Sequence, residues 1–219
     1  FDINIKDYKR ICSIYIEGGK NGKVKEYDKS SILVFEGDYL NGKRNGKGKE
    51  YYNKGNLKYE GEFLNGERNG KGKEFYDYGK LVFEGEYLNG KRNGKGIEYY
   101  LDGKLKYEGD YLNGERNGKG KEYYSNGKLV FEGEYLNGKK LIGKGKEYYS
   151  NGQLLFEGEY LNGKRWNGKG FNNNGKIDFE IKEGNGKGRE YYKDGKLKYE
   201  GQYLNGERNG KGKEYYYDG

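Results

Sequence analysis

The sequence predicts an all-β fold, an elongated solenoid-like array of β-hairpins that forms one long twisted antiparallel sheet. Three observations lead to this prediction: a 24-residue unit recurs, large apolar and polar residues alternate within each unit, and Asn-Gly steps separate the alternating stretches. Helices are disfavoured because 42 of the 219 residues are Gly. Each Gly costs about 1 kcal/mol in a helix relative to Ala.

The repeat is clearest in residues 35–58, FEGDYLNGKRNGKGKEYYNKGNLK, which return with few changes in the units that follow. We expect one domain over residues 1–219, because the periodicity covers nearly the whole chain and hairpins of this kind gain stability by stacking. The expected units are a degenerate one at 15–34, regular ones at 35–58, 59–82, 83–106 and 107–130, a 25-residue one at 131–155, irregular ones at 156–178 and 179–198, and a C-terminal one at 199–219.

Each unit has the pattern of a hairpin. In the second regular unit, Tyr59, Gly61 and Phe63 share one parity while Lys58, Glu60 and Glu62 share the other, as in a strand with one packed face. A second strand is predicted from Gly70 to Tyr76. The steps Asn65-Gly66 and Asn69-Gly70 are expected to bracket the first turn, and residues 77–79 to form the second, because Asn and Gly tolerate positive φ.

Glycine inside the strands calls for a specific reason, since it normally weakens them. We expect glycines at fixed positions to leave room for Tyr and Phe rings from neighbouring strands to lie across the backbone. Glu60 and Glu62 are expected near Lys71 and Lys73 on the wet face, where each cross-strand pair contributes about 0.2–1 kcal/mol. The fixed glycines are Gly37, Gly61, Gly85, Gly109 and Gly133.

The unit [YF]-E-G-[ED]-[YF]-L-N-G-x-R-N-G-K-G, as at residues 35–48 and 107–120, resembles the MORN repeat, whose core is Y-x-G-x-W-x-x-G-x-x-x-G-x-G. Here the unit has 24 residues where the family typically has 23, and Tyr or Phe replaces the usual Trp. The K-E-Y-Y-x-x-G-K-L half resembles the variant repeat common in bacterial proteins. The replaced positions are Tyr39, Phe63, Tyr87, Tyr111, Tyr135, Tyr160 and Tyr203.

This resemblance implies elongated all-β rods that serve as scaffolds, as dimerising or partner-binding modules, or as appendages to enzymes. It also implies attachment of some members to membranes through anionic phospholipids. We therefore expect a non-catalytic scaffold or protein–protein interaction module that binds a protein partner or a second copy of itself. The alternative is peripheral attachment to an anionic phospholipid membrane.

The residue types exclude most catalytic chemistry. The chain has no His, so His-based triads and His-metal sites are excluded, and Cys12 has no second Cys for a disulfide or a zinc cluster. Acid pairs such as Glu84 and Glu86 recur in almost every unit, whereas an active site requires one distinct environment. The G-K-G-K runs lack the G-x-x-x-x-G-K-[ST] phosphate loop. We expect no enzyme activity, no cofactor and no metal.

The excess of basic residues, +8 over the chain, invites nucleic acid or lipid. No unit is strongly basic, and single-stranded nucleic acid needs exposed rings in a continuous basic groove, so we expect no nucleic-acid binding. Anionic lipid would be contacted by the richest local cluster, at on the order of 1 kcal/mol for each cation. That cluster is Lys43, Arg44, Lys47 and Lys49.

The repeat breaks at two successive turns. Leu141 and Ile142 interrupt the usual Arg-Asn-Gly, and Trp166 is inserted into the next unit, where equivalent turns should lie on the order of 10 Å apart. These three residues form either a partner site, as tip residues on rigid scaffolds often do, or an apolar cluster tucked under the irregular segment 171–178. The flanking cations are Lys139, Lys140, Lys164 and Arg165.

No apolar run approaches the roughly 18 residues that span a bilayer, so we expect a soluble chain. The single Cys is consistent with a reducing compartment, and we expect a cytoplasmic location at a membrane or the cytoskeleton. The first residue is Phe and the chain has no Met. We therefore expect a processed or excised segment of a longer protein.

Overall fold

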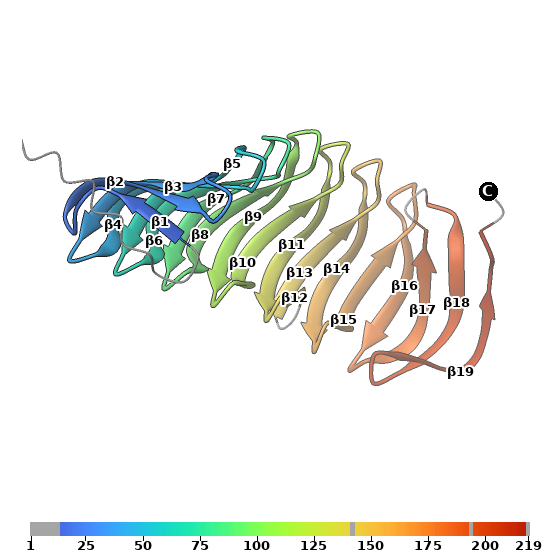
Figure 1. Ribbon diagram of the computed structural model, residues 1–219. Helices are drawn as coiled ribbons and strands as arrows, with labels where there is room; N and C mark the ends of the chain where they lie inside the picture. Colours follow the sequence, from blue (N-terminus) through green and yellow to red (C-terminus); the bar gives the residue numbers. More distant parts are fainter. Residues whose placement is uncertain (1–13, 141–142, 193–194, 218–219) are drawn as a thin grey trace, which may run out of the picture. The chain divides into compact units, whose positions relative to one another are not determined.

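The computed structural model describes residues 14–140, 143–192 and 195–217 (Figure 1). Its regular elements are all β-strands, and successive strands pair antiparallel. The chain divides into two compact parts, each with several repeats, which we call unit 1 (residues 1–103) and unit 2 (residues 104–219). Within each unit the predicted all-β array of antiparallel hairpins is confirmed.

Unit 1 contains hairpins joined edge to edge, each strand pairing with the strands before and after it in sequence. The strands of unit 1 are β1 (Ile14–Glu17), β2 (Gly22–Asp28), β3 (Leu33–Leu40), β4 (Lys43–Tyr51), β5 (Leu57–Leu64), β6 (Glu67–Phe75), β7 (Leu81–Leu88) and β8 (Lys91–Tyr99).

Unit 2 continues the same plan with two irregular stretches, a short β12 and shortened strands from β15 to β17. The strands of unit 2 are β9 (Leu105–Leu112), β10 (Glu115–Tyr123), β11 (Leu129–Leu136), β12 (Lys139–Lys140), β13 (Gly143–Tyr148), β14 (Leu154–Leu161), β15 (Lys164–Phe171), β16 (Ile177–Lys182), β17 (Asn185–Tyr191), β18 (Leu197–Leu204) and β19 (Glu207–Glu214).

Two kinds of turn alternate along the array. Asn65 and Gly66 both have positive φ, 53° and 98°, which is the two-residue hairpin turn that matches the twist of the strands. The opposite turn is closed by Gly79, whose N–H donates to the carbonyl of Tyr76 at 2.8 Å, as predicted for residues 77–79. Both turn types are therefore set by local sequence.

The second Asn-Gly step does not belong to the turn, and that part of the prediction is wrong. Asn69-Gly70 lies inside β6, which begins at Glu67 instead of Gly70. Between two paired positions β5 advances by two residues while β6 advances by four, so this step forms a bulge. The bulge extends the strand toward the tip and adds Arg68 to its packed face.

The core is a continuous row of aromatic rings on one face of the sheet. Phe35, Tyr59 and Phe83 are 0% exposed. Phe35 packs edge-on against Phe63 at 5.2 Å between centroids, and Tyr59 packs in the same way against Tyr87 at 5.2 Å. Each contact links one hairpin to the next, so ring packing joins the repeats.

The glycines do accommodate these rings, but the source of the ring differs from the prediction. Phe35 lies over Gly37 of its own strand, two residues on, as well as over Gly48 of the neighbouring strand. Gly37 and Gly48 are opposite each other in register. One ring therefore covers a pair of glycines, and any Cβ there would overlap it. The same own-strand arrangement holds at Gly61, Gly85, Gly109 and Gly133.

Candidate functional site

Arginines cap the ring row. In unit 1 the guanidinium carbon of Arg68 lies 4.2 Å from the centroid of the Tyr59 ring, and its nitrogens donate to Glu50 and Glu74. Glu50 also accepts from Arg44, and Glu74 from Arg92, so cations and carboxylates alternate from hairpin to hairpin. This Arg–Glu ladder joins repeats by charge-assisted bonds above their rings.

Burial and charge act in opposite directions on this ladder. Burial alone would lower the pKa of Arg44, but its bonds to Glu26 and the nearby carboxylate of Glu50 raise that pKa above the usual range. In unit 2, burial alone would raise the pKa of Glu147, but the charge and the hydrogen bond of Arg165 lower it. In both residues the neighbouring opposite charge thus outweighs burial and favours the ionised form.

The four cations proposed to contact lipid do not form one exposed cluster. Lys43 and Lys47 are exposed, whereas the Arg44 side chain is 22% exposed and bonded to Glu26 and Glu50. Lys47 and Lys49 lie on the opposite face, where their register partners are Glu62 and Glu60. Arg44 and Lys49 are therefore paired with carboxylates, whereas Lys43 and Lys47 are exposed.

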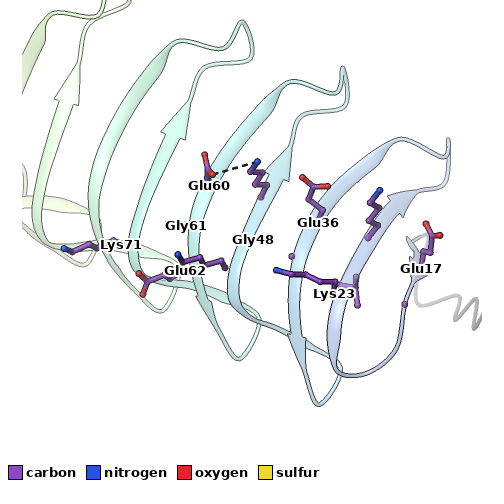
Figure 2. A pocket seen from close by; sticks show the side chains of 14 residues that line it. Glu17, Lys23, Glu36, Gly48, Glu60, Gly61, Glu62 and Lys71 are labelled. Carbon is purple, nitrogen blue, oxygen red and sulfur yellow. Dashed lines mark ion pairs between the residues drawn. The ribbon is translucent and has the colours of Figure 1, made fainter.

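That opposite face carries a groove of about 710 Å³ in unit 1. Figure 2 shows its lining, with glycines Gly48 and Gly61 between charged side chains from successive strands. The dashed line in Figure 2 is the ion pair of Lys49 with Glu60 at 3.9 Å. A second hollow of about 600 Å³ shares Glu60 and Lys71 with the first and extends the groove toward β8.

Charges in the groove alternate by strand. Acidic side chains project from β3, β5 and β7, and lysines from β4 and β6. Lys73 lies 3.5 Å from Glu84, and their side chains are 54% and 32% exposed. Ion pairs as exposed as this one contribute little to stability. Glu60 is paired in register with Lys73, as predicted. The groove is lined by nearly equal numbers of glutamates and lysines, and glycines lie between them.

A row of leucines borders the groove at the hairpin tips. Leu40, Leu64 and Leu88 are 50%, 46% and 49% exposed. Each alternates with the buried rings of its strand and so lies on the groove face. Neighbouring leucines are two strands apart, about 10 Å. We call these three residues the leucine row; the sequence analysis does not single them out.

Profiles of the MORN repeat match residues 35–57, 59–80, 83–104, 107–128 and 199–219. The chain belongs to the MORN-repeat family. Profiles of the MORN repeat variant match residues 141–162 and 185–205, which agrees with the resemblance to the variant form. A search of curated proteins finds no match.

The first of the two predicted breaks in the repeat lies partly outside the described residues, since Leu141 and Ile142 are not among them. Lys139 is exposed on β12. Lys140 occupies a ladder position, with its ammonium 3.3 Å from Glu122 and 4.7 Å from the centroid of the Phe131 ring. The cation predicted to flank a partner site therefore replaces a ladder arginine.

The second irregularity is centred on Trp166, which is partly buried in β15. Its ring lies beside Gly184, where an added Cβ would meet Trp166 Cζ3 at 2.7 Å, and its carbonyl accepts from the N–H of Gly184 at 2.7 Å. The contact is thus with the neighbouring turn at residues 183–184. This contact differs from both predicted alternatives for Trp166, a free partner site and an apolar cluster under residues 171–178.

A shortened hairpin tip explains the position of Trp166. The β16–β17 hairpin has the usual two-residue turn, here Glu183-Gly184, but β17 lacks the Lys-Arg pair that opens the second strand of a regular repeat. Across it, Lys164 of β15 pairs with Glu207 of β19 at 2.6 Å. Arg165 retains the ladder role, bonded to Glu147 at 2.7 Å. Trp166 fills the space that the missing tip residues leave.

The segment 171–178 keeps a normal turn. The N–H of Gly175 donates to the carbonyl of Asn172 at 2.9 Å, and the N–H of Asn172 donates to that of Lys176 at 2.9 Å. These are the bonds of the regular turn closed by Gly79. Strand β16 then begins at Ile177. The turn within this segment is therefore regular, with Phe171 at the end of β15 on one side and Ile177 at the start of β16 on the other.

The described residues offer little for catalysis. Within the described ranges, no three His, Cys, Asp or Glu side chains gather as a metal site. Those same ranges contain no helix that could cross a bilayer. The acid pairs Glu60/Glu62 and Glu84/Glu86 occupy equivalent positions in one groove, so neither has a distinct environment. The geometry suits binding of an extended surface better than chemistry at one point.

Proposed function

We propose that this MORN-repeat chain is a non-catalytic scaffold that binds a protein partner through the groove and leucine row of unit 1. The observation that carries the proposal is the charge balance of the groove beside exposed leucines. A charge-balanced surface has little net attraction for an anionic membrane, whereas apolar side chains spaced along a polar groove suit a polypeptide. We place this scaffold in the cytoplasm, at a membrane or the cytoskeleton.

Site-specific photo-crosslinking tests the proposal. A photoreactive amino acid at Leu64 should capture a discrete polypeptide, or a second copy of the chain, in cells that express the protein. The same residue at Lys54, an exposed turn position at the other end of the hairpin, is the matched control and should capture far less. Replacing Leu40 and Leu88 with Ser should reduce capture at Leu64.

Phospholipid attachment is the second candidate, favoured by the exposed Lys43 and Lys47. It predicts co-sedimentation with phosphatidylserine vesicles that collapses when salt is added, because screening weakens exposed charges. Protein binding through leucines should survive moderate salt. Salt-sensitive vesicle binding without a crosslinked polypeptide would favour the lipid role and reject the protein-binding role.

A further inference from the structure

The last hairpins of unit 2 break the charge alternation of the MORN array, and in β18 one position is changed. The first strand of each regular repeat carries two acidic residues, and the second of them is paired in register with a lysine of the strand before it. Glu62 of β5, for example, is paired with Lys47 of β4. The equivalent residue of β18 is Gln202, paired in register with Lys187. An acid is therefore replaced by a neutral side chain of the same length.

Gln202 retains the structural role of the acid that it replaces. In β9, Asp110 accepts from the N–H of Lys119 at the strand bulge, at 3.1 Å. Gln202 Oε1 accepts from the equivalent N–H of Lys211, also at 3.1 Å. The hydrogen bond needs an oxygen and not a charge. The substitution thus changes electrostatics while it preserves the fold.

The resulting hollow is more basic than its counterparts. A hollow of about 600 Å³ is lined by four cations and two carboxylates, around a floor of Gly188, Gly201 and Gly212. The hollow around β6 and β7 has equal numbers of each. The charged residues of the basic hollow are Lys187, Arg189, Lys211, Lys213, Asp178 and Glu200.

The two carboxylates of this hollow are already engaged. Arg189 bonds Asp178 and also lies 3.2 Å from Glu200. Tyr191 donates to Asp178 at 2.5 Å, and Tyr215 donates to Glu200 at 2.9 Å. Across the described part of the chain, no carboxylate pairs with Lys187 or Lys211. Both ammonium groups are exposed beside Gln202.

We propose that Lys187, Gln202 and Lys211 form a binding site for an acidic segment of a protein partner. The two lysines lie two strands apart, about 10 Å. An extended chain in the polyproline II conformation places every third side chain on one side at about 9.3 Å, so carboxylates at positions i and i+3 match the lysines. The glycine floor admits such a chain, and the Gln202 amide N–H groups can donate to it.

A narrow acidic chain suits this site better than a membrane does. The basic strip is confined to two lysines and one amide, with Asp178 and Glu200 close by in the same hollow. A broad anionic surface would approach these carboxylates and be repelled, whereas a single chain can follow the lysines alone. The site lies in unit 2 and does not depend on the groove of unit 1.

Fluorescence polarisation with a labelled octaglutamate peptide on the full chain tests the site. Gln202→Glu restores the acid of the regular repeat and keeps the bulge acceptor. It should weaken binding on the order of tenfold, since two close charge interactions are lost. The reverse exchange in unit 1, Glu62→Gln, should strengthen octaglutamate binding. An octapeptide of alternating Lys and Glu is the control peptide, and it should bind neither Gln202→Glu nor Glu62→Gln appreciably.

Three results would overturn the proposal. The first is that Gln202→Glu melts at the wild-type temperature and binds octaglutamate as tightly as the wild type does. The second is that the wild type binds the alternating peptide as tightly as octaglutamate. The third is a preference for phosphatidylserine vesicles that Gln202→Glu abolishes while octaglutamate binding persists. Crosslinking at Leu64 reports on unit 1 separately, so failure here leaves the proposed scaffold function standing and the converse also holds.

Discussion

Gly37→Ala tests the packing of rings over glycines. A Cβ at Gly37 would lie 2.6 Å from Gly48 Cα, 2.7 Å from the carbonyl oxygen of Lys47 and 2.7 Å from Phe35 Cζ. Ordinary contact begins near 3.4 Å, so these atoms must separate by about 0.7 Å. Two of the three belong to backbone, so the cost cannot be avoided by rotating one side chain.

The expected loss of stability follows from these contacts. Overpacking of this kind costs about 1–3 kcal/mol. Displacing Phe35 also weakens its edge-on contact with Phe63, centroids 5.2 Å apart, worth about 0.5–1.5 kcal/mol. We expect unfolding free energy to fall by about 3 kcal/mol. Without the overlap, Ala would instead stabilise the strand by about 0.4–1 kcal/mol, so the sign is diagnostic.

Urea unfolding followed by far-ultraviolet circular dichroism measures the effect, and hydrogen exchange at Gly48 localises it to unit 1. Gly19→Ala is the matched control, because the nearest atom to its added Cβ is 3.7 Å away and its φ is not positive. It should change stability by less than about 0.5 kcal/mol. Equal stability of Gly37→Ala and Gly19→Ala would refute the proposed packing.

Three further predictions concern the ladder, the tryptophan and the tyrosines. Arg68→Met should destabilise unit 1 by about 2–4 kcal/mol in urea unfolding, because Glu50 and Glu74 lose a partly buried partner. Arg68→Lys should recover only part of the loss, since lysine lacks the planar guanidinium whose separate nitrogens bond the two acids; full recovery by Lys would contradict the ladder. Trp166→Ser should lower thermal stability by about 2 kcal/mol, since its ring packs on Gly184; a wild-type melting temperature would show that the ring is dispensable. Burial, followed by a hydrogen bond to a carboxylate, raises the pKa of Tyr99 and of Tyr191 to about 12 from the ordinary value of 10.0. Because the folded state favours the neutral phenol, the stability that these two tyrosines contribute should be fully present below pH 10 and should fall as the pH rises toward 12. Ultraviolet titration and unfolding as a function of pH measure this, and tyrosines that all titrate near 10 in the folded chain would contradict it.

The sequence was sufficient to predict the hairpins, because their turns are encoded locally by Asn65-Gly66 and Gly79 and their faces by simple alternation. The ladder was missed for a physical reason. Arg68 shares the parity of Gly70 and Gly72, but the sequence predicts that the second Asn-Gly step brackets the turn. Only the register shows that this step is a bulge inside the strand, and hence that Arg68 reaches the ring of Tyr59.

The irregular repeats show a second limit of sequence reasoning. The sequence predicts that Trp166 either is exposed in a partner site or packs under residues 171–178, the segment beside it in sequence. Its actual neighbour, Gly184, belongs to a hairpin whose second strand is two residues shorter than β4, so one hairpin gains bulk where the next loses it. Such compensation between adjacent repeats requires knowledge of which turns are neighbours in space.

The α-proton chemical shifts of the glycines test the central claim most directly. Protons that lie over the face of an aromatic ring are shifted upfield. The account predicts upfield α-protons for Gly37, Gly48, Gly61 and Gly72, which lie beneath Phe35 and Tyr59, relative to the turn glycines Gly42 and Gly66, which have no side chain nearby. Indistinguishable shifts for the two groups would show that the rings do not lie on the glycines, and would contradict the packing that joins the repeats.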